Sequence, residues 1–198
     1  MERRIEVVKC SILDASTDCV VNASNETATL GGGVSRVLRE ECGPDLQAEM
    51  KDKLEAEFGG QLQEDDCLVT SACTSTKFRY VLHVPAVDYS CTKARLGTEG
   101  QVVHTVSSVD RISSCTTAAL EAAAKLAQDD GVTSIAFPLL GAGSGRVPVG
   151  SASRAMADAM RAFVADDQVI CRVVLAVPED DRFATCKRVF DAVFGRGS

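Results

Sequence analysis

Two glycine-rich turns, each placed directly after an apolar segment, carry the residues of this sequence best suited to chemistry. The first turn is Gly31-Gly32-Gly33, which follows Asn22 and Asn25 and leads into a helical pattern. Glycines let a ligand approach backbone N–H groups closely, and a helix that begins there directs its positive end at the same place. Neutral amides beside bare backbone suit a sugar and a phosphate. We therefore predict that this first glycine loop (residues 31–33) holds such a ligand.

The second turn, Gly141-Ala142-Gly143-Ser144-Gly145, follows the apolar segment 134–140. This second glycine loop (residues 141–145) gives the chain two places that suit an anion. The formal net charge of −7 and the pI near 4.9 argue against broad electrostatic binding to nucleic acid, which needs a basic surface. A polyanionic ligand would instead be held by local backbone dipoles, which glycine loops supply.

The composition is that of an ordinary globular protein. With 198 residues, 45% of them hydrophobic and 25% charged, the chain fits one domain spanning residues 1–198. No apolar run approaches the roughly 18 to 20 residues of a membrane span, so we expect no membrane association. The two histidines, His83 and His104, have no partner at ligand spacing. We therefore expect neither a metal nor a cofactor, and we interpret His83 as a satisfied core histidine.

The nine cysteines are odd in number and form no CxxC motif. Most lie in apolar segments, so we interpret them as small buried hydrophobic residues, Cys10 and Cys42 included. The first residues lead straight into a strand pattern and not into a secretory signal. From these features we expect a reducing intracellular compartment, the cytoplasm or the nucleus.

Hydrophobic periodicity predicts an α/β fold. Strands are expected over 5–8, 19–21, 67–72, 80–84, 134–140 and 169–177, and helices from 33, over 45–58 and 113–129, from 148, and over 179–194. Residues 86–105 show no clear period and are expected to form an exposed connection. Because strands alternate with helices, we predict a mostly parallel sheet between helices. In such folds ligands bind at the carboxyl ends of strands, where both glycine loops and Pro85 are placed.

The ordered motifs of this chain resemble the macrodomain family of ADP-ribose-binding modules. The resemblance rests on the runs Val20-Val21-Asn22-Ala23-Ser24-Asn25, Leu30-Gly31-Gly32-Gly33-Val34 and Ala136-Phe137-Pro138-Leu139-Leu140-Gly141-Ala142-Gly143, with Pro148 beyond. It implies a three-layer α/β/α sandwich with a mixed, mostly parallel central sheet and one ADP-ribose cleft. Some members of the family only bind the ligand, whereas others hydrolyse ADP-ribose from acidic side chains or deacetylate O-acetyl-ADP-ribose.

The resemblance also implies roles for individual residues. Asn25 matches the asparagine that contacts the distal ribose and is the candidate catalytic residue, while Asn22 matches the one that shapes the loop beneath it. The resemblance and the residue pattern together predict a set of ligand-binding residues. They are Ser11, Ile12, Asn22, Ala23, Asn25, Gly31, Gly32, Gly33, Val34, Pro85, Gly141, Ala142, Gly143, Ser144, Gly145 and Arg146.

Three positions depart from the family pattern. Where macrodomains carry Gly-Asp-Ile, with the aspartate on the adenine amino group, this chain has Cys10-Ser11-Ile12, with Asp14 nearby. Where hydrolytic members carry a catalytic aspartate, it has Ser35, a weak catalytic candidate because serine is a poor base. The second glycine loop lacks the aromatic residue that often stacks near the distal ribose and is followed by Arg146, a cation either for the phosphates or for a different terminal group.

Three functions stay open at this point. The first is a monomeric binding module whose partner is ADP-ribose or an ADP-ribosylated protein. The second is a mono-ADP-ribosyl hydrolase or O-acetyl-ADP-ribose deacetylase in which Asn25 and the ligand's own phosphate position the water. The third is an α/β interaction domain without a ligand. In that case Asn22 and Asn25 are turn and cap residues, since asparagine favours both.

Overall fold

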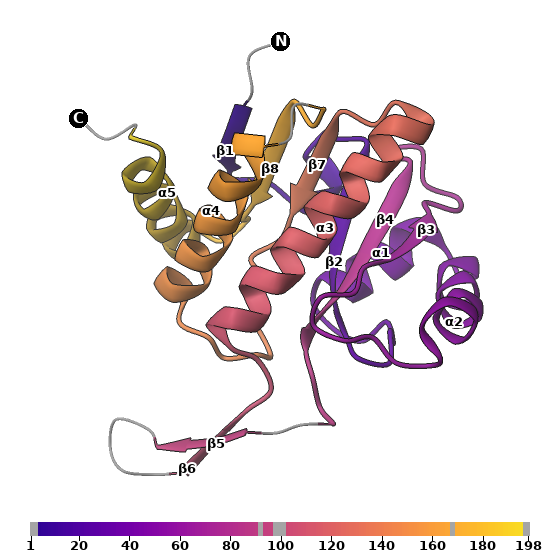
Figure 1. Ribbon diagram of the computed structural model, residues 1–198, viewed down its shortest axis with the longest axis horizontal. Helices are drawn as coiled ribbons and strands as arrows, with labels where there is room; N and C mark the ends of the chain where they lie inside the picture. The colour runs from indigo at the N-terminus through magenta and orange to yellow at the C-terminus, as the bar shows by residue number, and fades with distance from the viewer. Residues whose placement is uncertain (1–3, 91–92, 97–101, 167–168, 196–198) are drawn as a thin grey trace.

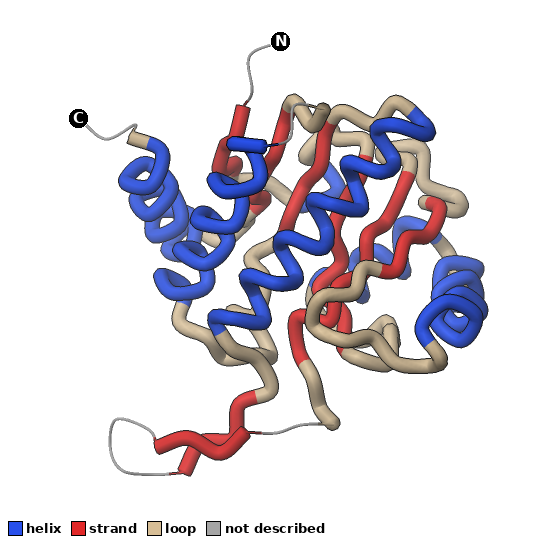
Figure 2. Tube along the Cα trace, in the orientation of Figure 1, coloured by secondary structure: helices blue, strands red, loops and turns tan. Residues whose placement is uncertain are grey.

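The computed structural model describes residues 4–90, 93–96, 102–166 and 169–195 (Figures 1 and 2). Along these ranges the elements follow one another as β1 (Arg4–Val8), η1 (Ile12–Asp14), β2 (Cys19–Asn25), α1 (Val34–Cys42), α2 (Asp45–Phe58), β3 (Leu68–Ser71), β4 (Tyr80–Val87), β5 (Lys93–Leu96), β6 (Val102–Thr105), α3 (Val109–Asp130), β7 (Ser134–Phe137), α4 (Val149–Asp166), β8 (Arg172–Ala176) and α5 (Asp180–Phe194).

Six of the strands form one mixed sheet in the order β1-β8-β7-β2-β4-β3. The neighbours from β1 to β4 pair in parallel, and β3 pairs with β4 in the antiparallel sense. Figure 1 shows α3, α4 and α5 over one face of the sheet and α1 and α2 on the other. This arrangement confirms the predicted three-layer α/β/α sandwich with a mostly parallel sheet.

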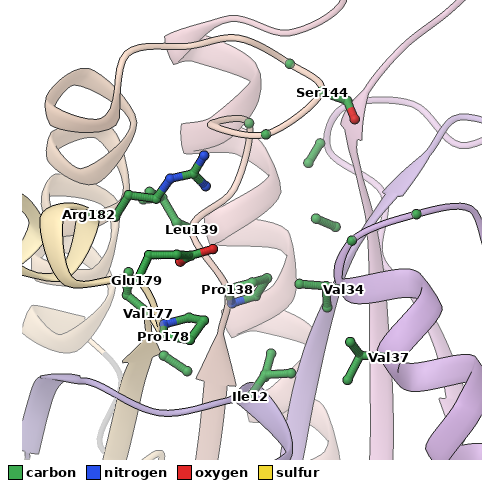
Figure 3. A pocket seen from close by; sticks show the side chains of 18 of the residues that line it. Ile12, Val34, Val37, Pro138, Leu139, Ser144, Val177, Pro178, Glu179 and Arg182 are labelled. Atoms are coloured by element: carbon green, nitrogen blue, oxygen red, sulfur yellow. The ribbon is translucent and has the colours of Figure 1, made fainter.

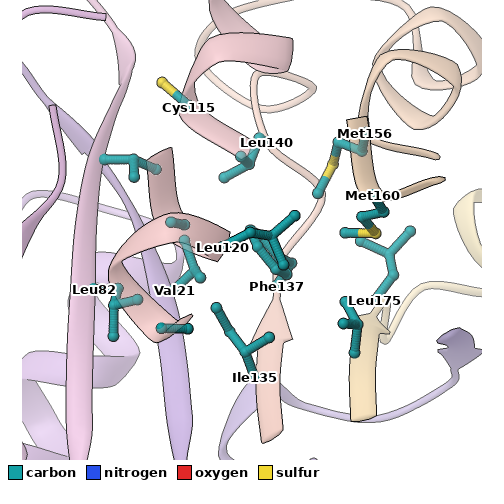
Figure 4. Packing of buried hydrophobic residues seen from close by; sticks show 14 of the residues in the cluster. Val21, Leu82, Cys115, Leu120, Ile135, Phe137, Leu140, Met156, Met160 and Leu175 are labelled. Atoms are coloured by element: carbon teal, nitrogen blue, oxygen red, sulfur yellow. The ribbon is translucent and has the colours of Figure 1, made fainter. Parts of the chain in front are cut away.

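The central strands are buried on both faces, which explains their continuous apolar sequence. Successive side chains of a strand point to opposite faces, so each strand contributes to two hydrophobic clusters. On the face covered by α3, α4 and α5, the cluster contains Val21, Phe137, Leu175, Leu120 and Met156 (Figure 4). On the face covered by α1 and α2, it contains Val20, Ala136, Val174, Leu38, Leu46 and Met50.

Two element boundaries differ from the periodicity because local chemistry decides them. Strand β7 ends at Phe137, earlier than expected, since Pro138 has no N–H to continue the ladder. Helix α3 begins at Val109, four residues before the predicted start at 113. Its N-cap is Ser108, whose hydroxyl oxygen accepts a hydrogen bond from the N–H of Arg111 at 3.1 Å.

The predicted exposed connection over residues 86–105 contains strands that the sequence period does not reveal. Strand β4 continues to Val87, and β5 and β6 form an antiparallel ribbon that extends away from the sandwich (Figure 1). Strand β4 passes through Pro85 because its pairing with β2 shifts there, from Ala23 opposite Val84 to Asn25 opposite Val87. Such an irregularity accommodates a residue without an N–H, and pairing resumes beyond it. Residues 91–92 and 97–101 lie outside the described ranges.

Asp18 joins three strands at the edge of the sheet where β2 begins. Its Oδ2 accepts four hydrogen bonds of 2.8 to 3.1 Å from the N–H and hydroxyl groups of Thr133 and Ser134, which lead into β7. Its backbone carbonyl accepts a bond of 2.7 Å from the N–H of Arg79, just before β4. Burial by itself would raise the pKa of Asp18, but the four hydrogen bonds outweigh it and lower the pKa.

We expect Asp18→Ala to lower the free energy of unfolding by about 1–2 kcal/mol at neutral pH, because the donors of Thr133 and Ser134 lose a charged acceptor that is partly exposed. The folded-state pKa lies below the unfolded value of 3.8. The stabilisation that ionised Asp18 gives to the folded state is therefore complete above pH 3.8 and is lost as the pH falls through the folded-state pKa. Urea unfolding of the wild type and the variant between pH 7 and pH 3 measures it.

The matched control is Asp14→Ala, since Asp14 is an exposed aspartate of η1 whose side chain forms no hydrogen bond with the described residues. Its unfolding free energy should stay close to that of the wild type at neutral pH. A destabilisation by Asp18→Ala that does not diminish with falling pH would contradict the assigned role.

Candidate functional site

A cleft of about 440 Å³ opens at the carboxyl ends of β2, β7 and β8. Figure 3 shows it between the start of α1 on one side and the loops that follow β7 and β8 on the other. Its volume lies within the range of small-molecule sites, and its place is the one where open α/β sheets bind ligands. Both glycine loops line it, through Gly32, Gly33, Gly141, Gly143, Ser144 and Gly145.

The first glycine loop presents an uncapped helix start to the cleft. Gly33 is the N-cap of α1, and its φ of 60° and ψ of −132° lie in a region that favours glycine. No side chain caps the helix there. Within the described part of the chain, the N–H groups of Gly32, Gly33 and Val34 donate to no acceptor. These donors and the positive end of the helix are available to an anion in the cleft.

The second glycine loop is a compact turn closed by its own backbone. The N–H of Arg146 donates to the carbonyl of Gly143 at 3.0 Å, and the N–H of Val147 donates to that of Gly141 at 3.1 Å. Packing requires two of its glycines. A Cβ on Gly141 would lie 2.5 Å from Cδ1 of Ile112, and one on Gly145 would lie 2.5 Å from the carbonyl oxygen of Gly141.

Gly32 and Gly143 have no such internal reason to be glycine. A Cβ at either position would meet nothing within 4 Å, and neither residue has a positive φ. Both nevertheless line the cleft. Since neither the backbone conformation nor the packing of the protein excludes a side chain there, the bare backbone leaves room for something that enters the cleft.

A chain of buried hydrogen bonds supports the first glycine loop from below. The hydroxyl of Ser35 donates to Oδ1 of Asn22 at 2.8 Å, and Nδ2 of Asn22 lies 3.0 Å from Nδ1 of His83. Nε2 of His83 lies 2.9 Å from the hydroxyl oxygen of Thr70, which in turn reaches the carbonyl of Val81 at 3.5 Å. This chain connects β3, β4 and β2 to the first turn of α1.

Burial lowers the pKa of His83 to about 3, so its imidazole is neutral. Because the amide of Asn22 donates to Nδ1, the ring proton is on Nε2 and is donated to Thr70. The ring is fully buried with both nitrogens paired. These contacts agree with the interpretation of His83 as a satisfied core histidine.

Neither catalytic candidate faces the cleft. Ser35 is buried, hydrogen-bonded to Asn22 and absent from the lining, so it supports the start of α1 and is not presented as a nucleophile. Asn25 is also outside the lining. Its Oδ1 accepts from the N–H of Thr29 at 2.8 Å, and its Nδ2 donates to the hydroxyl of Thr27 at 3.0 Å, as a turn residue would.

The structure brings together most of the predicted binding residues, although their contact with a ligand stays a prediction. Those that line the cleft are Ser11, Ile12, Ala23, Gly32, Gly33, Val34, Gly141, Gly143, Ser144 and Gly145. Those outside the lining are Asn22, Asn25, Gly31, Pro85, Ala142 and Arg146. Asn22 and Pro85 lie within β2 and β4, and Asn25 bonds to the turn that follows β2.

Several residues that line the cleft are not predicted from the sequence, namely those that follow β8 and those that complete the walls. The lining also contains Arg36, Val37, Ala86, Val87, Pro138, Leu139, Ala176, Val177, Pro178, Glu179 and Arg182. The rule that ligands bind at the carboxyl ends of strands, applied to β8, would have pointed to 177–179. Glu179 is the one carboxylate of the lining within the described residues, and the arginines Arg36 and Arg182 are its cations.

None of the cysteines in the described part of the chain lines the cleft. Burial raises the pKa of Cys10, and it raises the pKa of Cys42 to about 12. Cysteines with raised pKa values are poor nucleophiles at neutral pH.

Within the described ranges, no three histidine, cysteine, aspartate or glutamate residues are grouped so as to hold a metal ion. None of the helices in those ranges is long and apolar enough to span a membrane.

The chain matches known proteins along most of its length. The family model described as Macro domain matches residues 21–156. An uncharacterized protein of Aquifex aeolicus is 27% identical over 185 residues, which are 93% of this chain and 96% of that protein. A macro domain-containing protein of Streptomyces nogalater is 28% identical over 157 residues, which are 79% of this chain and 77% of that protein.

Solved structures agree with the fold. An Oceanobacillus iheyensis macrodomain with ADP superposes with a TM-score of 0.79 at 19% identity, covering 99% of this chain and 94% of the other. A Trypanosoma brucei macrodomain in complex with ADP-ribose superposes with a TM-score of 0.69 at 23% identity, covering 93% of this chain and 68% of the other. At these identities the likeness establishes the shared architecture.

We expect Ser35→Ala to lower the free energy of unfolding by about 1–2 kcal/mol, because Oδ1 of Asn22 is then buried without its donor. Urea unfolding measures the change. Ser114→Ala is the control, since Ser114 is a half-buried serine of α3 whose hydroxyl forms no hydrogen bond with the described residues. Equal stability of the wild type and Ser35→Ala would refute a supporting role for the serine.

Proposed function

This chain belongs to the Macro domain family, and from that premise we propose that it binds ADP-ribose, free or attached to a protein, in the cleft between its two glycine loops. The observation that carries the proposal is the pair Gly32 and Gly143, which line the cleft as bare backbone although nothing inside the protein requires it. The related macrodomain structures from Oceanobacillus iheyensis and Trypanosoma brucei, with ADP and with ADP-ribose respectively, support the choice of ligand.

The diphosphate of the ligand lies between the two loops. The unpaired N–H groups at the start of α1 donate to one side of it, and the helix dipole favours its negative charge. The second glycine loop supplies the other side, where the N–H groups of Gly143, Ser144 and Gly145 donate to no acceptor within the described residues. Arg36 and Arg182 add positive charge to the lining. This arrangement explains how an acidic chain holds a dianion without a basic surface.

The adenine base occupies the apolar end of the cleft. Ile12, Val34 and Val37 line it from the side of η1 and α1, and Val177 and Pro178 line it from the loop after β8 (Figure 3). Burial of a flat base against aliphatic side chains is favourable at roughly 25 cal/mol for each Å² of apolar surface removed from water. The terminal ribose then points toward Ala23 and Ser144, at the opposite end.

Binding without hydrolysis is the activity that the side chains favour. A general base must come within hydrogen-bond reach of the water that it activates. Glu179, the carboxylate that lines the cleft in the described structure, comes from the loop at the base end. At the opposite end, the amide of Asn25 is bonded to Thr27 and Thr29 and the hydroxyl of Ser35 to Asn22.

We expect Gly32→Glu to abolish ADP-ribose binding, because it places a side chain and a negative charge where the diphosphate lies. Isothermal titration calorimetry measures the affinity, and thermal unfolding checks the fold. Unfolding should stay cooperative because a Cβ at Gly32 meets no neighbour. Gly150→Glu is the matched control, since Gly150 is equally open but belongs to α4 and does not line the cleft. Absence of heat from the wild type at millimolar ADP-ribose would refute the proposal and leave the ligand-free interaction domain.

We expect no release of ADP-ribose above background when the protein is incubated with a substrate in which ADP-ribose is linked to an acidic side chain. The same preparation should bind free ADP-ribose, which shows that the cleft is intact. Measurable release would favour the hydrolase or deacetylase alternative. In that case loss of release in Asn25→Ala, but not in Ser35→Ala, would identify Asn25 as the residue that positions the water.

A further inference from the structure

The base end of the cleft is formed by two loops that the sheet brings together. Strands β1 and β8 pair in parallel, and the N–H of Val177 donates to the carbonyl of Val8 at 3.0 Å. The loop after β1, with Ser11 and Ile12, therefore lies beside the loop after β8, with Glu179. Any polar group of a base bound here meets side chains from these two loops.

The first of these loops offers a weak acceptor. The hydroxyl oxygen of Ser11 accepts from the N–H of Leu13 at 3.4 Å as the N-cap of η1. Asp14, the carboxylate close to it in sequence, is exposed and outside the lining. A neutral hydroxyl that already caps a helix forms a weaker hydrogen bond with a ligand donor than an ionised carboxylate does.

The second loop offers a strong acceptor that the protein itself does not use. Glu179 is the N-cap of α5, but its side chain forms no capping hydrogen bond and no ion pair with the described residues. Lys9, a cation near this helix start, pairs with Asp180 instead. Figure 3 shows the Glu179 side chain reaching toward the cleft and not folded back onto α5.

A carboxylate in a cleft that holds a dianion is electrostatically unfavourable unless the ligand gives it a hydrogen bond. The donor that an adenine base presents is its exocyclic amino group, and a carboxylate accepts well from such groups. Resting on the function proposed above, we propose that Glu179 determines the specificity of the cleft for adenine by accepting a hydrogen bond from the 6-amino group.

Arg182, three residues further along α5, also lines the cleft but has a different task. Its guanidinium forms no ion pair or hydrogen bond with the described residues, Glu179 included. As a donor-only cation it acts on the negative charge of the ligand and not on an amino group. Glu179 and Arg182 are therefore separable, because one depends on the base and the other on the phosphates.

The test compares ADP-ribose with its hypoxanthine analogue, inosine diphosphate ribose, in which an oxo group replaces the 6-amino group. Calorimetry with the wild-type chain should show a preference for ADP-ribose of roughly tenfold. Glu179→Ala should weaken the binding of ADP-ribose by a similar factor and leave the affinity for the analogue nearly unchanged. In Glu179→Gln the side-chain amide can donate to the oxo group, so the preference should shift toward the analogue.

Two variants serve as controls. Asp181→Ala removes a carboxylate from the same helical turn that does not line the cleft, and it should bind both ligands like the wild type. Arg182→Gln should weaken both ligands by the same factor. Because Glu179 is exposed and makes no side-chain bond that the fold uses, its variants should unfold at the wild-type temperature.

If Glu179 only repelled the ligand's negative charge, Glu179→Ala would have the opposite effect on affinity and would tighten the binding of both anionic ligands. That result, or equal weakening of both ligands by Glu179→Ala, would overturn the proposal while the binding function stands. If the wild-type chain binds neither ligand, the proposed function fails and this inference fails with it.

Discussion

The cleft depends on the buried hydrogen-bond chain that runs from Thr70 through His83 and Asn22 to Ser35. Each member belongs to a different element, so the chain fixes the start of α1 relative to three strands of the sheet. Buried polar groups are costly unless they are paired, and here every link is paired with its neighbour. A helix start held in this way presents its N–H groups to the cleft without needing to be reorganised when an anion arrives.

The glycines of the two loops differ in whether packing requires them. In the second loop, Gly141 and Gly145 are required because a Cβ would collide with Ile112 or with the backbone of the loop itself. At Gly32 and Gly143 a Cβ would meet nothing within 4 Å, so packing does not require these two glycines, and both line the cleft. Some glycines of these loops are thus required by the packing of the turn, whereas others leave open space at the cleft.

Much of the architecture could be predicted from the sequence because the signals are local. Apolar runs and helical periodicity identify the central strands and most of the helices, and the bounds of α2 follow from Pro44 before it and Gly59 after it. The β5–β6 ribbon and the continuation of β4 through Pro85 depend on pairing partners that local sequence does not reveal. Glu179 was missed for a similar reason, since its place beside Ser11 follows from the pairing of β1 with β8.

The direction of the buried hydrogen bonds explains why a serine, and not a carboxylate, fits at position 35. Ser35 donates to Asn22, Asn22 to His83, and His83 to Thr70, whose hydroxyl faces the carbonyl of Val81. An ionised carboxylate at the start of α1 can only accept hydrogen bonds. Each donor and acceptor in the series from position 35 to Thr70 would then have to exchange roles. The hydroxyl of Thr70 would donate to the imidazole of His83 in place of the carbonyl of Val81. The new charge would also be buried against the neutral amide of Asn22, and His83 beyond that amide stays neutral at ordinary pH because its pKa is about 3. The hydrogen bonds that support the first glycine loop are therefore arranged around a donor at position 35.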